Sequence, residues 1–215
     1  MHFRWLVPIA LALGLAAGCT SEGGAGTSGS PSVPISSSAP PTVQTPTATP
    51  TPKSSSATVP TTGPNVRPGE KPPVLTGLAR DNSPPGAVDF TLFWFESVDW
   101  AYATTDSTLA RQQFSKLCTG CERFMKNIID ESARKNEHFR GGRLSVTTRA
   151  LAKNDGHNGS SAVVDTRVNQ TKFKLVSAQG KTVDTSNGVS GARFRTWLAW
   201  LDGRWVVVDW KQDSQ

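Results

Sequence analysis

The alternation of hydrophobic and polar residues divides the chain into three parts. An apolar run from Trp5 to Ala17 comes first, and a long stretch of small and polar residues follows it up to about Leu75. Beyond that point hydrophobic residues return at regular intervals. A spacing near 3.6 residues indicates helices that face a core, whereas strict alternation indicates half-buried strands. We therefore predict one folded domain over residues 76–215.

The first half of this domain has the spacing of helices. Pro84-Pro85-Gly86 precedes a long apolar stretch, Val88 to Ala103, whose hydrophobic residues occupy more than one helical stripe. Such a helix is buried on most of its sides. Shorter helical patterns cover Ser107 to Leu117 and Cys121 to Asn136, and Gly141-Gly142 ends the helical half.

The second half of the domain alternates with a period of two. Alternating segments begin at Leu144 and Ala162, and a third strand begins near Phe173. Helices followed by antiparallel strands form an α+β arrangement, in which the helices cover one face of the sheet. We expect N-terminal helices packed on a curved antiparallel sheet.

The C-terminal segment carries the clearest local signal. Phe194 to Leu201 and Arg204 to Trp210 flank Asp202-Gly203, whose residues tolerate the positive φ angles of a type I′ hairpin turn. Counting outward from the turn pairs Thr196 with Asp209. Because both faces of this hairpin are apolar, we expect both to be covered.

The N-terminal apolar run has the properties of a secretion signal. Arg4 supplies the positive start, and Ala16-Ala17-Gly18-Cys19 resembles the bacterial lipobox, in which the Cys receives a diacylglyceryl group. The run is shorter than the roughly 20 residues that cross a bilayer as a helix, which argues against a permanent transmembrane helix. An ordinary signal peptide with an incidental Cys is the alternative. We predict that residues 1–19 are a lipoprotein signal peptide and that Cys19 anchors the protein to the extracytoplasmic face of the cell membrane.

The segment between this signal and the domain, residues 20–75, is rich in Ser, Thr, Pro and Gly. Side chains so small and polar cannot offset the entropy lost when a backbone becomes ordered. We predict that the segment is a disordered tether that holds the domain away from the membrane.

Composition narrows the range of partners. The chain carries 23 Lys and Arg against 17 Asp and Glu, a formal net charge of +6, and its basic residues form no run. Nucleic-acid binders concentrate such charge in one stripe or patch. We therefore expect no nucleic-acid partner, and no motif in the sequence calls for a cofactor.

Two cysteines remain once Cys19 is lipidated. In an oxidising compartment Cys118 and Cys121 form a disulfide by default, which would join the second and third predicted helices. A redox role is the alternative, although the pair lacks the βαβ setting of thioredoxin-like proteins. Metal binding would need His138 and His157, and neither stands at zinc-finger spacing, so we expect no metal site.

Catalytic residues are sparse in this sequence, which has no Gly-x-Ser-x-Gly elbow and no metal motif. Asp99 is the one candidate, because it shares an apolar helical stripe with Phe95 and Tyr102. A carboxyl buried there would have a raised pKa and could act as a general base. The alternative is that Asp99 accepts hydrogen bonds from backbone or from an Arg and only positions the helix.

Several large side chains of the domain could line a ligand pocket. The candidates are Trp94, Asp99, Tyr102, Trp197 and Trp210. The alternative for the aromatic ones is a place in the hydrophobic core, which a domain of this size needs.

A resemblance to known proteins rests on four segments. They are Phe93-Trp94-Phe95, Asp99 to Thr104, Cys118-Thr119-Gly120-Cys121 and Asp202 to Val207. Over about residues 76–211 the chain resembles an uncharacterised family of actinobacterial lipoproteins, which is itself similar to the nuclear-transport-factor-2-like, or SnoaL-like, cone fold. The resemblance implies a sheet that wraps the first helix into a cone around a pocket. Relatives with that fold include ketosteroid isomerase, polyketide cyclases and non-enzymatic binding modules, so it implies no single reaction.

We interpret the chain as a cell-envelope lipoprotein that presents a binding or interaction domain outside the membrane. A protein or a small apolar molecule would be its ligand. One alternative is a small-molecule enzyme of the isomerase or cyclase type that uses a pocket carboxylate. The other is a structural spacer.

Overall fold

The computed structural model of the protein describes residues 58–213. The predicted signal peptide, the lipidation site at Cys19 and most of the predicted tether lie outside the described residues. No helix within residues 58–213 combines the length and the apolar character that crossing a bilayer requires.

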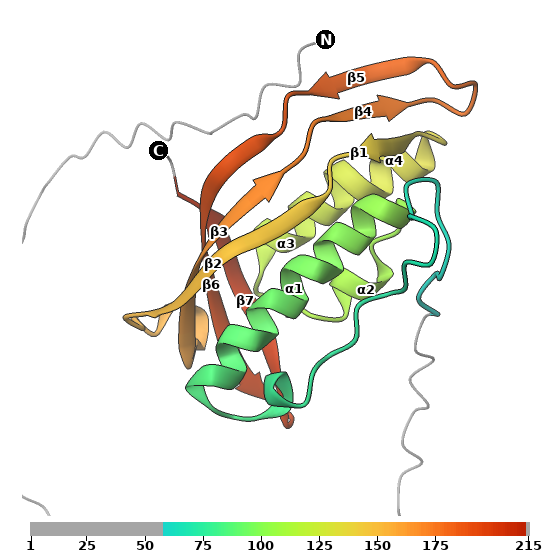
Figure 1. Ribbon diagram of the computed structural model, residues 1–215. Helices are drawn as coiled ribbons and strands as arrows, with labels where there is room; N and C mark the ends of the chain where they lie inside the picture. Colours follow the sequence, from blue (N-terminus) through green and yellow to red (C-terminus); the bar gives the residue numbers. More distant parts are fainter. Residues whose placement is uncertain (1–57, 214–215) are drawn as a thin grey trace, which may run out of the picture. The chain divides into compact units, whose positions relative to one another are not determined.

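Helix α1 (Pro84–Thr104) runs through the middle of the domain and confirms the predicted apolar helix (Figure 1). Ser83 begins it, because its hydroxyl accepts a hydrogen bond from the Gly86 N–H at 3.1 Å. Pro84 and Pro85 fit the first two positions, where a helix needs no backbone donor. Most residues of α1 are buried, so the helix is packed on several sides rather than along one face.

The other helices are short. They are η1 (Leu78–Arg80), α2 (Thr108–Arg111), α3 (Thr119–Phe124), η2 (Met125–Asp130), α4 (Glu131–Arg134) and η3 (His157–Gly159). Helices α3, η2 and α4 follow one another directly and correspond to the third predicted helix. The second predicted helix, Ser107 to Leu117, is wrong beyond α2, because Gln113 and Ser115 exchange backbone hydrogen bonds with Val207 of the sheet instead.

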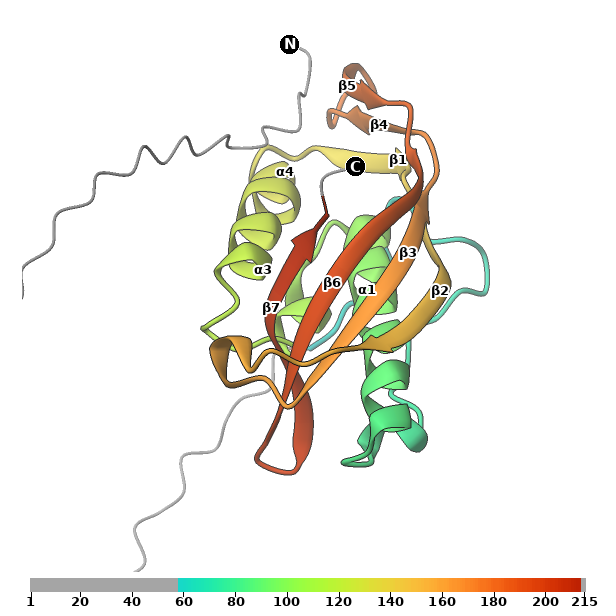
Figure 2. The ribbon, with the colours of Figure 1, turned by 90° about the vertical axis from the view of Figure 1, so that its left-hand side faces the viewer.

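The described residues form two antiparallel sheets. Their strands are β1 (His138–Gly141), β2 (Leu144–Ala152), β3 (Ala162–Gln170), β4 (Phe173–Val176), β5 (Thr182–Ser186), β6 (Val189–Leu201) and β7 (Arg204–Gln212). The larger sheet has the order β2-β3-β6-β7 and the smaller one the order β1-β4-β5. The helices α1 to α4 lie on one face of the larger sheet, as Figure 2 shows. The predicted α+β arrangement with antiparallel strands is therefore confirmed.

The β6–β7 hairpin forms at the predicted turn, with positive φ angles at Asp202 (50°) and Gly203 (76°). Its pairing departs from the simple outward count, because the register shifts between Trp197 and Leu198. Beyond this bulge Thr196 pairs with Trp210, and the predicted pairing with Asp209 is wrong. A bulge moves every later side chain to the other face of the strand. It therefore turns the Trp210 side chain toward α1.

Aromatic rings fill the space between α1 and the larger sheet. The rings that meet around Trp210 belong to Trp94, Phe95, Phe124 and Phe194. Trp210 stacks on Phe194 with the ring centroids 5.2 Å apart, and it meets Phe124 edge to face at 5.3 Å. Edge-to-face and stacked contacts of this kind add to the free energy gained by burying the rings. This cluster joins the buried rings of Trp94 and Phe95 to half-buried rings at the edge of the hydrophobic core.

The ordered domain begins earlier than predicted. Residues 58–75, which their composition assigned to the tether, pack against the domain, and we call them the strap. Asn65 exchanges two side-chain hydrogen bonds with the backbone of Gly141, at 2.7 and 3.0 Å. At Gly63 the strap comes so close to α1 that a Cβ atom would lie 2.5 Å from the Cα of Thr104. These contacts join single residues of the strap to distant parts of the domain, so the sequence of the strap shows no hydrophobic periodicity that would reveal it.

Candidate functional site

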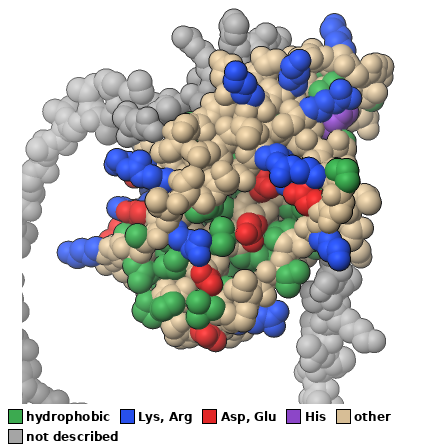
Figure 3. Space-filling view, in the orientation of Figure 1, with side chains coloured by type: hydrophobic (Ala, Val, Ile, Leu, Met, Phe, Trp, Pro, Cys, Tyr) green, Lys and Arg blue, Asp and Glu red, His purple; other side chains and the backbone are tan. Residues whose placement is uncertain are grey.

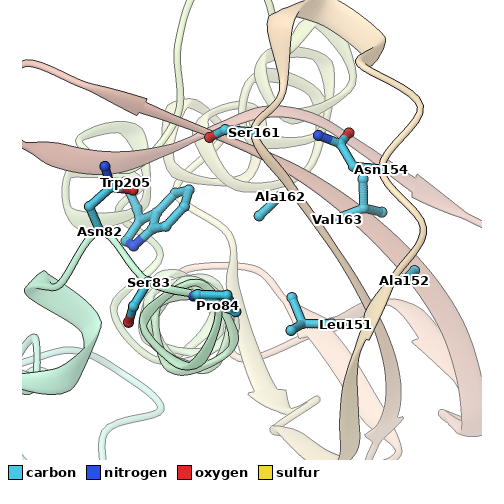
Figure 4. Close-up of a pocket in the computed structure, with 10 residues that line it drawn as sticks. All are labelled: Asn82, Ser83, Pro84, Leu151, Ala152, Asn154, Ser161, Ala162, Val163 and Trp205. Atoms are coloured by element: carbon cyan, nitrogen blue, oxygen red, sulfur yellow. The ribbon is translucent and has the colours of Figure 1, made fainter.

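A hollow of about 250 Å³ opens at the end of the domain where α1 begins (Figure 4). The residues that line it are Asn82, Ser83, Pro84, Leu151, Ala152, Asn154, Ser161, Ala162, Val163 and Trp205. Figure 4 shows Leu151 beside Pro84, with Ala162 pointing toward the same space. None of the lining side chains is ionisable, so the site favours an uncharged, largely apolar group.

Most polar groups of this hollow already have partners within the domain. The Ser83 hydroxyl caps α1, and the Ser161 hydroxyl accepts a hydrogen bond from the Trp200 N–H at 3.2 Å. The Asn154 side chain bonds to residues of the β2–β3 loop, including the Ser160 carbonyl at 2.9 Å. A ligand in the hollow would therefore contact mainly hydrophobic surface.

Strand β2 leaves one edge of the larger sheet open beside the hollow. Among the described residues it pairs only with β3, and residues 147–151 are exposed. Leu151 stands where this edge meets the hollow and is 49% exposed. Leu78 of η1 and Leu201 of the β6–β7 hairpin lie at the same end of the molecule, each 45% exposed. Exposed strand edges and clustered hydrophobic side chains are typical of protein-binding surfaces.

Helix α1 and strand β2 are in contact beyond the hollow, and we call the line where they meet the seam. Two contacts join helix and strand across it, from Asp89 to Arg149 at 3.3 Å and from the Leu144 N–H to Asp99 at 2.7 Å. Half-buried hydrophobic residues along the seam are Val88, Leu92, Leu144 and Val146. Glu96 projects between the two contacts, and partial burial raises its pKa although Arg149 opposes the shift. Figure 3 shows acidic side chains among hydrophobic ones on this face.

The candidate catalytic residue Asp99 is held by neighbours. Its two carboxylate oxygens accept hydrogen bonds from Arg143 at 2.6 to 3.1 Å, and one also accepts the Leu144 N–H. Arg143 is only 7% exposed and also binds Glu70 of the strap. Burial lowers the pKa of Arg143, but its hydrogen bonds to Glu70 and Asp99 raise it by more. Hydrogen bonds from an Arg and from backbone are the contacts expected for the alternative in which Asp99 positions the helix.

The five residues proposed to line a pocket do not come together. Trp94 and Tyr102 are 0% and 3% exposed and belong to the core with Trp210. Asp99 lies in the ion cluster, and Trp197 points to the opposite face of the sheet. None of them lines the hollow. Three buried polar atoms near Trp210 have no hydrogen-bond partner among the described residues: its own Nε1, Trp94 Nε1 and Thr196 Oγ1.

The β2–β3 loop covers the outer face of the larger sheet. Asp155 accepts a hydrogen bond from Trp197 Nε1 at 2.9 Å, and the His157 ring packs on Trp197 with centroids 5.0 Å apart. His157 Nε2 lies 2.6 Å from a carboxylate oxygen of Asp209 on β7. The bulge at Val208 in β7 places Asp209 on this face, and the predicted cover on both faces of the hairpin is confirmed. The His–Asp contact joins the loop to the sheet.

The predicted disulfide between Cys118 and Cys121 is confirmed. Both cysteines are 0% exposed, and Cys118 also caps α3 by accepting the Cys121 N–H at 3.3 Å. Within residues 58–213 no three His, Cys, Asp or Glu side chains are placed to hold a metal ion. His138 and His157 lie on different elements, β1 and η3.

Sequence reasoning missed the hollow and the strap. The signal for Leu151 was present, because Leu151 is a lone large hydrophobic residue at the end of a polar strand. The strap carried the weaker signal of Val59, Val66 and Leu75, which pack against the core from a segment rich in Pro and Thr.

Comparisons with known proteins bear on the family and the fold. A family model described as "Family of unknown function (DUF6318)" matches residues 64–211. None of the curated proteins matches the chain.

Solved structures give remote likenesses. The intermembrane space region of the chloroplast protein ARC6 is 11% identical with a TM-score of 0.43, over 63% of this chain and 99% of that one. An NTF2-like protein of unknown function from Shewanella baltica is 12% identical with a TM-score of 0.32, over 63% and 100%. The protein Aln2 from a Streptomyces species is 15% identical with a TM-score of 0.26, over 45% and 61%. The resemblance to an uncharacterised family is confirmed by the family model, and the chain belongs to the family of unknown function DUF6318.

Proposed function

We propose that the protein is an extracytoplasmic lipoprotein, anchored through Cys19, whose domain binds an extended segment of a partner protein. The lipobox-like Ala16-Ala17-Gly18-Cys19 supports the anchor. The observation that carries the binding function is the meeting of an apolar hollow with the open edge of β2 at Leu151.

The size of the hollow favours a side chain over a free small molecule. Small-molecule sites usually enclose about 300–1,000 Å³ and bury most of the ligand. The hollow holds about 250 Å³ and lies at the surface beside a strand edge, so it suits one or two apolar side chains. An extended segment can supply them while its backbone pairs with the free edge of β2.

The seam adds a charge preference to this partner. A strand that pairs with β2 would pass along α1, where Glu96 lies among half-buried hydrophobic residues. Glu96 is exposed, so a basic side chain on the partner could pair with it. The partner segment should therefore combine apolar residues with a Lys or Arg. The bulge after Val146 and the charge of Arg149 limit indiscriminate pairing at the same edge.

Site-specific photo-crosslinking in cells tests the proposal. A photo-reactive amino acid would replace Leu151, and the control would place it at Leu117, which is 56% exposed near the disulfide. We expect one discrete protein adduct from position 151, absent at 117 and reduced when Glu96→Lys reverses the charge of the seam. The same adducts at both positions would contradict the proposal. An adduct of twice the chain's own mass would show that the segment bound at Leu151 belongs to a second copy of this chain, and would contradict a different partner protein.

A further inference from the structure

A second hollow, of about 300 Å³, lies on the smaller sheet and has the opposite chemical character. The residues that line it are Arg140, Lys172, Phe173, Lys174, Thr185, Ser186 and Asn187. We call it the basic cleft. It belongs to the end of the molecule formed by β1, β4 and β5, whereas the apolar hollow lies where α1 begins (Figure 1). In Figure 3 several Lys and Arg side chains gather over this end, with no acidic side chain among them in that view.

The three cations of the basic cleft have no counter-ion in the described part of the chain. Ten ion pairs occur among residues 58–213, and none includes Arg140, Lys172 or Lys174. Arg140 and Lys174 are direct cross-strand partners between β1 and β4. Like charges at such positions destabilise a sheet unless something neutralises them.

Side chains that can donate hydrogen bonds also line the basic cleft. Thr185 pairs with Lys174 across β4 and β5, so its hydroxyl lies on the same face as the cations. The Thr185 hydroxyl and the Asn187 amide have no hydrogen-bond partner within residues 58–213, and the Ser186 hydroxyl only accepts the Gly188 N–H. The nearest acid on the strand, Asp184, pairs with Leu175 and therefore lies on the other face.

Glycines hold these walls in place. At Gly141 the backbone has φ 80°, and a Cβ there would lie 2.3 Å from the carbonyl oxygen of Lys172. The Gly142 N–H donates to that same oxygen at 3.0 Å. Lys172 and the end of β1 are thus fixed against each other before any ligand arrives, which reduces the ordering cost of binding.

From these observations we propose that the basic cleft binds a phosphate ester. The strand register places Arg140, Lys174 and Thr185 on one face of the smaller sheet, and Lys172 and Asn187 line the cleft beside them. Three cations and two side chains that can donate suit a group with up to two negative charges and several acceptor oxygens. The volume exceeds that of one phosphate group, so the cleft leaves room for a portion of the organic part. The site is separate from the apolar hollow, so it does not depend on the proposed protein partner.

Phosphate esters of this kind have two sources, a soluble molecule or the headgroup of an anionic lipid. The test uses the chain from residue 20 onward, without acyl chains, so that membrane binding cannot arise from the anchor. Glycerol 3-phosphate would be titrated by NMR, and vesicles of phosphatidylglycerol would be compared with vesicles of phosphatidylcholine. Binding of glycerol 3-phosphate indicates a soluble source, and binding only to phosphatidylglycerol vesicles indicates a headgroup.

Matched charge deletions decide whether binding occurs in the basic cleft. We expect Lys174→Gln to weaken the observed binding by about tenfold, whereas Lys116→Gln, at an exposed lysine outside the cleft, changes it less than about twofold. The thermal midpoint of Lys174→Gln should equal or exceed that of the parent, because a repelling pair is removed. Absence of binding to both probes, or equal losses in the two variants, would overturn the proposal.

Discussion

Arg143 shows how a single buried charge joins separate parts of this domain. It lies between Glu70 of the strap and Asp99 of α1, and its Nη1 also reaches the carbonyl of Asn65 at 3.3 Å. A buried guanidinium needs such partners, because removing either carboxylate leaves charge without its neutralising contact. The cluster therefore fixes the strap, the helix and the start of β2 against one another.

The pH dependence of stability follows from Glu70. Hydrogen bonding from Arg143 lowers the pKa of Glu70 below its usual 4.5, against the opposing effect of partial burial. A carboxyl with a lowered folded-state pKa stabilises the protein above about pH 4.5, and this contribution is lost as the pH falls further. We expect Glu70→Gln to cost about 1–2 kcal/mol of unfolding free energy at pH 7, and we expect this difference from the parent to be smaller at pH 3 because protonation of Glu70 then weakens its contact with Arg143. Urea unfolding at both pH values checks this, and a constant difference between the two proteins would contradict it.

At the scale of elements, the strap is the part whose removal matters most. Trp100 Nε1 donates to the Pro60 carbonyl at 3.0 Å, and the Asn65 N–H donates to the carbonyl of Ala103 at 3.0 Å. The donor and the acceptor on α1 would both lose their partner if the strap were absent. A buried donor or acceptor without a partner lowers the free energy of unfolding, unless a water molecule can reach it and form the missing hydrogen bond.

Truncation tests the role of the strap. A chain that begins at Thr76 should lose about 3 kcal/mol or more, because Arg143 loses Glu70 together with the hydrogen bonds of the strap. That loss lowers the thermal midpoint by roughly 10 °C for a domain of this size. A chain that begins at Thr58 should have the same thermal midpoint as the chain that begins at Thr20. If all three melted together, the strap would have no structural role.

The elements also show what sequence alone can predict. Helix α1 and the last hairpin turn were predictable, because proline at the helix start, dense hydrophobic residues and Asp202-Gly203 act locally. The bulge between Trp197 and Leu198 was not, since a register shift depends on packing across the sheet. It decides that Trp210 enters the core and that Asp209 meets His157.

The candidate sites were less predictable than the fold. The sequence singled out Asp99 as a candidate catalytic residue, but it did not reveal the ion cluster, because Arg143 lies 44 residues after Asp99 and the strap glutamate 29 residues before it. The apolar hollow and the basic cleft both combine residues from several elements. Only topology brings Leu151 beside Pro84, or Arg140 beside Lys174.

At the scale of the whole molecule, two hollows of different character lie at different ends of one α+β domain. The apolar hollow meets an open strand edge, and the basic cleft presents cations that lack counter-ions within residues 58–213. A domain proposed to be anchored by Cys19 through residues 20–57 could use both surfaces at the cell envelope. The proposed protein partner and the proposed phosphate ester would then not compete for the same place.

Labelling of single introduced cysteines in intact cells tests the central claim most directly. Leu151→Cys and Leu117→Cys each add one thiol to a chain whose Cys118 and Cys121 are joined and whose Cys19 is proposed to be lipidated. A membrane-impermeant maleimide should label position 117 equally fast in cells and in the purified protein. It should label position 151 readily in the purified protein but about tenfold more slowly in cells, because the bound partner covers this position. A tenfold change corresponds to about 1.4 kcal/mol of protection. Equal labelling of 151 and 117 in cells would contradict an occupied hollow, and no labelling at 117 would contradict the extracytoplasmic location.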